Sequence, residues 1–256
     1  MRADPVEVLS RDATLILGGA CAILLQVANP VVGAAVAEHS DFALRPLGRL
    51  NNTLTFVYGA VLGTPAQREL VARATRGAHR NIPEANDSHY QLWVAATLYE
   101  TAVRVYERVH APLAPDIAQE VLERYAVLGT TLEVPAALWP ATTAAFDTYW
   151  ADAVAALDVT PAARQTARDL FHPVTAPRWM RAVLPLAALL TADLLGESLR
   201  SGFGLPWSRG RARRAAAAWG VIRVLAWALP ARLLSAPSRH YLARLDALSA
   251  RVANSG

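Results

Sequence analysis

The spacing of apolar and polar residues predicts a chain made almost entirely of α-helices. Apolar residues recur every three to four positions through most of the sequence, and alternating β-branched runs are nearly absent. Residue types that begin helices interrupt this pattern at regular points. The starts that we expect are a capping box at Thr64 and Gln67, a Thr-Pro start at Thr160, and single caps at Asp87 and Ser208. We therefore expect an all-α protein of nine or ten helices packed around one or more buried long helices.

The longest uncharged stretch lies near the N-terminus. Residues Thr14 to Val36 carry no charge and are numerous enough to span a bilayer. Pro30 would kink a helix in this stretch, so we favour a buried central helix that is broken near its end. The later apolar segments Ala182 to Leu195 and Ala215 to Leu229 are also expected to form core helices.

Composition excludes several kinds of chemistry. Hydrophobic residues make up 54% of the 256 residues, and all 25 basic residues are arginine. The absence of lysine excludes Schiff-base and P-loop lysine chemistry, and a single cysteine, Cys21, excludes disulfides and multi-thiolate metal sites. We expect one domain over residues 1–256. The N-terminus lacks the pattern of a secretory signal, so the expected location is cytoplasmic, with peripheral membrane association as a further option.

Positive charge is concentrated at the C-terminal end. From Arg200 onward there are ten arginines and one acid, Asp246, whereas residues 1–199 hold 15 arginines and 20 acids. The basic segment 208–256 includes Arg209, Arg213 and other arginines beside an apolar helix, which could contact anionic lipid or an acidic partner. The alternative is a solvated basic helix lying against the acidic remainder of the molecule. Nucleic acid is not an expected partner, since no groove-reading motif is present.

An arginine and a threonine share one face of a helix predicted around residues 49–57. Arg49 and Thr53 are four residues apart, so their side chains project from the same side. Apolar residues crowd the same turns, and we expect this face to be buried. A buried guanidinium is costly unless an anion or a hydrogen-bond network receives it, and an anionic cofactor is one such receiver.

His79 falls on the apolar side of the helix that begins at Thr64. By periodicity alone a core or capping histidine is commoner at such a position than a metal ligand. Glu107 and His110 form one Glu-x-x-His pair, but a di-iron bundle requires two such pairs and further glutamates. A zinc or di-iron site is therefore unsupported.

Several segments, in their order and spacing, resemble the family that holds the rubber oxygenases (latex-clearing proteins) and the fungal MpaB oxygenase of mycophenolic acid biosynthesis. The first three are LGGACAILLQVANPVVGAAVAEHSDFALRPLGRLNNTLTFVYGAVLGT, VARATRGAHR and EANDSHYQLWVAATLYET. The resemblance continues through the later apolar helices and covers about residues 12–215.

This resemblance implies a globin-like helical domain around a buried pocket for non-covalent haem b. It implies His79 as the proximal iron ligand, with Arg49 and Thr53 beside the haem. Arg49 would donate to a propionate or to bound oxygen, and Thr53 would orient water or dioxygen. The implied function is a haem b-dependent oxygenase that activates O₂ to oxidise an apolar small organic substrate.

The chain departs from the family pattern at several positions. The lysine that precedes the pocket threonine in the rubber oxygenases is Asn52 here, so polyisoprene is not the expected substrate. The loop after His79 is short, and no residue matches the glutamate proposed as a base in those enzymes. Two alternatives stay open: a haem-dependent oxidase or peroxygenase of secondary metabolism, and a non-catalytic haem-binding or membrane-peripheral protein.

Overall fold

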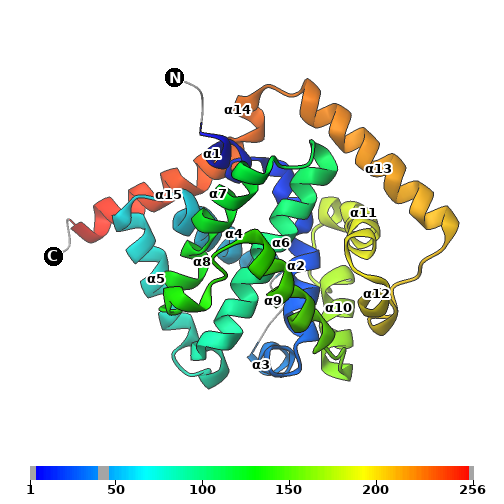
Figure 1. Ribbon diagram of the computed structural model, residues 1–256, viewed down its shortest axis with the longest axis horizontal. Coiled ribbons are helices and arrows are strands. Elements are labelled where there is room, and N and C mark those ends of the chain that lie inside the picture. The colour runs from blue at the N-terminus through cyan, green and yellow to red at the C-terminus, as the bar shows by residue number, and fades with distance from the viewer. Residues whose placement is uncertain (1–3, 40–45, 254–256) are drawn as a thin grey trace.

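The computed structural model describes residues 4–39 and 46–253, and all regular structure in these ranges is helical (Figure 1). The first half contains α1 (Pro5–Ser10), the 3-10 helix η1 (Ala13–Gly18), α2 (Gly19–Ala28), α3 (Pro30–His39), α4 (Pro46–Leu62), α5 (Pro65–His79), η2 (Pro83–Asn86), α6 (Ser88–Val109), α7 (Pro115–Tyr125) and α8 (Val127–Thr130). The second half contains η3 (Ala136–Leu138), α9 (Thr143–Ala155), α10 (Pro161–Phe171), α11 (Arg178–Leu194), α12 (Glu197–Gly202), α13 (Arg209–Ala228), α14 (Ala231–Leu234) and α15 (Ala236–Ala253).

The all-α prediction is confirmed, but the expected number of nine or ten helices is too low. Helices α1, α8, α12 and α14 are only four to six residues long. A segment of one turn has no repeating apolar face, so its sequence carries no periodic signal. Residues 40–45, which fall within the first family-like segment, lie outside the described residues.

Helix α6 lies at the centre and is buried on two sides (Figure 1). Trp93, Val105 and Val109 join the core shared with α2, α10, α11 and α13. Tyr99 belongs to a second core shared with α1, α4, α7 and α9, where its ring makes an edge contact with Phe146 at 4.6 Å between centroids. One long apolar helix therefore holds two groups of shorter helices together.

The expected helix starts are confirmed where the structure shows the caps. Thr64 and Gln67 form the reciprocal capping box at the start of α5, with Thr64 N donating to Gln67 Oε1 at 2.8 Å. The side chains of Asp87, Thr160 and Ser208 accept from backbone N–H groups of α6, α10 and α13. Each cap satisfies N–H groups that the helix itself leaves unpaired.

The uncharged N-terminal stretch is broken where proline predicts it. Residues Ala13–Ala28 and Pro30–His39 meet at an angle of 108°, and Asn29 caps the second segment by accepting from Val31 N and Val32 N. Among the described residues no single helix has the length and apolar character to cross a membrane, and this bent pair meets the criterion only when its two parts are combined. Cys21 and Leu24 in α2 are fully buried against the core.

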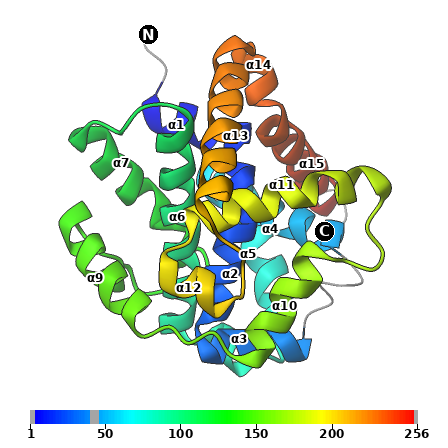
Figure 2. The ribbon, with the colours of Figure 1, turned by 90° about the vertical axis from the view of Figure 1, so that its right-hand side faces the viewer.

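The two later apolar segments are not simple core helices. In α13, Ala215 and Trp219 are buried, whereas Val224 is 63% exposed and Trp227 is 87% exposed. Helix α11 is buried at Leu190 but leaves Val183 half-exposed. The expectation of two core helices is therefore wrong for one part of each helix. For α13 the reason is its position at the outside of the molecule, where it runs from α12 to α14 (Figures 1 and 2).

Candidate functional site

His79 is the last residue of α5 and is half-buried. Its backbone carbonyl accepts from Ile82 N at 2.9 Å and from Asn86 Nδ2 at 3.0 Å. These bonds hold the short loop and η2 against the end of α5, so the chain that follows His79 is fixed in place. Burial lowers the pKa of His79 below 6.5, and the nearby positive charge of Arg49 lowers it further. The imidazole is therefore neutral at pH 7, the form in which a ring nitrogen can bind a metal ion.

Arg49 lies in the first half of α4 and is close enough to His79 to influence its titration. Asn51, about 200° around the helix from Arg49, faces α15 and accepts from Arg244 Nη1 at 2.9 Å. Helix α15 therefore covers one side of α4, and Arg49 and Thr53 project from a different side of the helix.

The expectation that the Arg49 face is buried is wrong. Thr53 is exposed, Arg49 is partly exposed, and Leu50 has 36% of its surface exposed. The buried part of α4 is its second half, where Tyr58 and Ala60 pack in the core. The neighbouring helices enclose α4 only near its C-terminal end. The spacing of apolar residues shows which side of α4 is apolar, but it does not show how far along α4 a neighbouring helix extends.

Close packing of α4, α5 and α15 fixes the relative positions of Arg49 and His79. A Cβ atom at Gly59 would lie 2.7 Å from Val71 Cγ1 and 2.9 Å from Leu245 Cδ1, so only glycine allows this approach of the three helices. Gln67 joins α5 to α15, since its Nε2 donates to Asp246 Oδ1 at 2.7 Å and to the Leu242 carbonyl at 3.3 Å. The site thus rests on a rigid three-helix unit.

These side chains fit a haem by the chemistry of their donor groups. A single neutral imidazole suffices as an axial ligand, and a guanidinium near it can pair with a propionate. Leu50, the residue after Arg49, offers exposed apolar surface of the kind that covers a porphyrin.

The other histidines have different surroundings. Within the described residues no group of three or more His, Cys, Asp or Glu side chains is arranged to hold a metal ion. His110 Nε2 lies 2.7 Å from Asp12 Oδ2, and its ring packs on Tyr106 with centroids 4.5 Å apart. His110 is thus engaged with Asp12 and Tyr106, and His89 is exposed.

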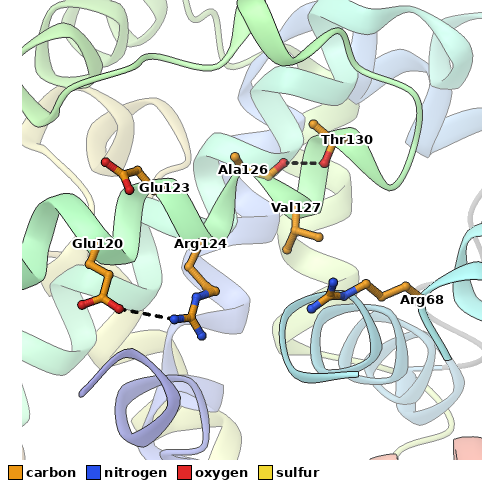
Figure 3. A pocket seen from close by; sticks show the side chains of 7 residues that line it. All are labelled: Arg68, Glu120, Glu123, Arg124, Ala126, Val127 and Thr130. Carbon is orange, nitrogen blue, oxygen red and sulfur yellow. Dashed lines mark hydrogen bonds and ion pairs between the residues drawn. The ribbon is translucent and has the colours of Figure 1, made fainter. Parts of the chain in front are cut away.

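A surface pocket of about 540 Å³ lies between α5 and the α7–α8 segment, away from this site (Figure 3). It is lined by Arg68, Glu120, Glu123, Arg124, Ala126, Val127 and Thr130. Arg124 pairs with both Asp4 and Glu120, and Arg68 Nε donates to the Ala60 carbonyl at 2.9 Å. A second pocket, lined by Arg104, Glu107, Arg108 and Leu194, is smaller. Its two arginines pair with Glu100 and Asp193, which lie outside its lining.

One partly buried ion pair, between Glu100 and Arg104, was not expected from the sequence. Glu100 is largely buried in α6, and burial raises its pKa although Arg104, four residues later, acts in the opposite direction. Arg104 also donates to the Leu194 carbonyl at 3.1 Å and lies over the ring of Trp150. The four-residue spacing of acid and arginine was the available signal, but it is equally common on solvated helices.

The fold and the site define an all-helical protein with a half-buried histidine beside an arginine. The chain belongs to the family described as ER-bound oxygenase mpaB/B'/Rubber oxygenase, catalytic domain, which matches residues 6–228. This confirms the family resemblance and extends it beyond residues 12–215 at both ends.

Two relatives are similar over most of their length. They are "Uncharacterized protein Rv2237" of Mycobacterium tuberculosis and "Uncharacterized protein Mb2261" of Mycobacterium bovis. Each is 31% identical to this chain over 224 residues, which cover 82% of the chain and 88% of the relative. No solved structure is significantly similar to the chain.

Proposed function

We propose that this protein is a haem b-dependent oxygenase that oxidises an apolar small organic substrate. The observation that carries the proposal is the half-buried His79, held in its neutral form beside Arg49, in a chain whose family is an oxygenase catalytic domain. A globin-like arrangement of the helices around the cofactor is part of this proposal.

In this proposal His79 holds the iron of the haem and Arg49 receives a propionate. When bound, the haem supplies the redox chemistry with dioxygen, and the protein determines where substrate and protons can approach. Thr53, one helical turn beyond Arg49, presents a hydroxyl that can orient a water molecule or dioxygen. Leu50, next to Arg49, provides apolar surface for substrate on the same helix.

Asn52 argues against polyisoprene as the substrate. It is exposed on α4 beside Thr53, at the position where the rubber oxygenases carry a lysine. An amide has no charge and cannot take over the electrostatic role of an ammonium group. We therefore assign a smaller apolar substrate.

The test is the haem content and absorption spectrum of the purified protein after reconstitution. One haem b per chain is expected, with a Soret band at the usual ~400–430 nm of histidine-ligated haem. His79→Ala should lose most of the haem or retain it only with added imidazole. The matched control is His89→Ala, an exposed histidine ten residues later, which should bind haem normally. A protein that cannot be reconstituted, or an unchanged spectrum in His79→Ala, contradicts the proposal.

Two further variants separate the roles assigned to α4. Thr53→Ala removes one exposed hydroxyl, so haem content should stay near normal while substrate turnover changes. Arg49→Ala should lower haem retention as well, because the propionate loses its cationic partner. Normal haem retention and normal turnover in both variants would show that the Arg49 and Thr53 side of α4 takes no part in haem binding or turnover. Turnover with peroxide in the absence of O₂ would indicate a peroxygenase instead.

A further inference from the structure

The largest group of exposed apolar side chains lies in the C-terminal part of the molecule, apart from a smaller group at Trp179, Val183 and Leu186 of α11. The larger group lies at the end of α13, in the turn after it and in α14, and we call this set the α13 tip. Its residues are Val221 (60% exposed), Val224 (63%), Leu225 (54%), Trp227 (87%), Leu229 (42%) and Leu233 (51%). An indole that is almost fully exposed beside five aliphatic side chains marks an interaction surface.

The arrangement around α13 separates an inner from an outer face. Ala215, Trp219 and Ala226 are buried, and Trp219 Nε1 donates to Asp193 Oδ2 at 3.0 Å, which fixes the helix to the body. At 100° per residue Arg213 and Val224 fall on the opposite side, within about 20° of each other. One outward face is therefore basic in its first half and apolar in its second half, and it can lie flat on a surface.

Positive charge surrounds the tip without compensation. Residues 209–239 contain no acid and seven arginines, which are Arg209, Arg211, Arg213, Arg214, Arg223, Arg232 and Arg239. Across the described ranges, no carboxylate forms a salt bridge with any of the seven. Arg223 instead donates to the Arg108 carbonyl and Arg239 to Ser235 Oγ. Helix α13 contacts Asp193 through Trp219, but none of these seven arginines pairs with an acid in the described part of the chain, so their charge is available to an anionic partner.

We propose that the α13 tip docks on an anionic phospholipid surface. Trp227 and its aliphatic neighbours enter the boundary between headgroups and acyl chains, where the amphipathic indole ring is favoured. The arginines contact lipid phosphates and anionic headgroups at the same depth. The inference is independent of haem binding, because α13 lies outside the α4–α5–α15 unit that carries His79.

A second copy of the chain fits this surface less well. A symmetric dimer would place the same patch on both sides of the interface, and the arginines of one copy would face those of the other without any acid between them. Nucleic acid would engage the arginines but leave Trp227 and Val224 in water. Anionic lipid is the partner that satisfies the charge and the apolar groups together.

Co-sedimentation with vesicles tests the proposal. The full chain should bind vesicles of phosphatidylcholine mixed with phosphatidylserine, bind phosphatidylcholine alone weakly, and dissociate in part at high salt. Trp227→Ala should weaken binding at least about tenfold, as loss of a buried large apolar side chain predicts. Arg213→Gln should weaken it about fivefold, the factor expected for one basic residue near an anionic surface.

Trp179→Ala is the matched control, because Trp179 is 62% exposed but lies in α11, outside the α13 tip. It should bind vesicles as the wild type does, and all three variants should keep wild-type circular dichroism. Absence of binding to the anionic vesicles overturns the proposal. Equal binding to phosphatidylcholine alone, or equal loss in Trp179→Ala and Trp227→Ala, also overturns it. A wild-type dimer that Trp227→Ala dissociates, without vesicle binding, would identify a second copy as the partner instead.

Discussion

Gln67 connects the helix that carries His79 to the C-terminal helix, and replacing it by glutamate tests how firmly the site is supported. Gln67 is 4% exposed and has a role at each end of its amide. Its Oε1 accepts from Thr64 N at the start of α5, and its Nε2 donates to Asp246 and to the Leu242 carbonyl of α15. Gln67→Glu keeps the shape and the cap acceptor but removes both donors.

The expected magnitude follows from these contacts. Each of the two lost hydrogen bonds contributes ~1 kcal/mol to stability. A bond to a charged group usually contributes more, but Asp246 is exposed to solvent, so the same value is used for its carboxylate. Two carboxylates then face each other across a former 2.7 Å contact, which adds about 1 kcal/mol after solvent screening and rotation of Asp246. The free energy of unfolding should therefore fall by about 3 kcal/mol at neutral pH.

Urea unfolding followed by far-UV circular dichroism measures this change. The matched rescue is Gln67→Glu combined with Asp246→Asn, which exchanges donor and acceptor across the same contact and should recover about 2 kcal/mol. Thr64→Ala, which removes only the cap, should cost ~1 kcal/mol. A Gln67→Glu protein within about 0.5 kcal/mol of wild type, or a double variant no more stable than the single one, would refute the assigned role.

Two further predictions concern buried titratable groups. Burial raises the pKa of Glu100 in the folded state above its ordinary value of 4.5. The ionised carboxylate is therefore less stable in the folded than in the unfolded protein, so Glu100 destabilises the fold as pH rises above 4.5 and does not do so at lower pH. Glu100→Gln should therefore gain stability relative to wild type as pH rises from about 4.5 to neutral, in urea unfolding measured at both pH values; a constant difference contradicts the assignment. Burial raises the pKa of the Cys21 thiol to about 12, and the side chain has no exposed surface. Ellman's reagent should label one thiol per chain only after unfolding, and rapid labelling of the native protein would contradict the burial of α2.

Local features of the fold could be predicted from sequence because a few adjacent residues determine them. The capping box of α5 and the cap of α13 each depend on a side chain and backbone groups within three residues. The break at Pro30 has the same origin, since proline lacks the N–H group and excludes the preceding turn. Such features need no knowledge of the neighbouring helices.

The exposure of α4 and α13 could not be predicted because it depends on which helix lies opposite. Leu50 and Val224 belong to apolar stretches that look like core, yet both have exposed surface. The pattern of apolar residues in α4 and α13 indicates an apolar surface on each helix, but it does not indicate which helix, if any, covers that surface. Gly59 gives the opposite case, since a residue usually unfavourable inside a helix marks a place where α5 and α15 both lie close against α4.

The nearness of Arg49 and His79 follows from the length of two helices and the loop between them. Helix α4 ends at Leu62 and α5 begins at Pro65, so the short connection makes the two helices antiparallel neighbours. Arg49 lies thirteen residues before the end of α4, and His79 lies fourteen residues after the start of α5. At 1.5 Å per residue both are about 20 Å from the turn and therefore at the same height along the pair. Thr53 lies about 6 Å nearer the turn, so Arg49 is closer in height to His79 than Thr53 is.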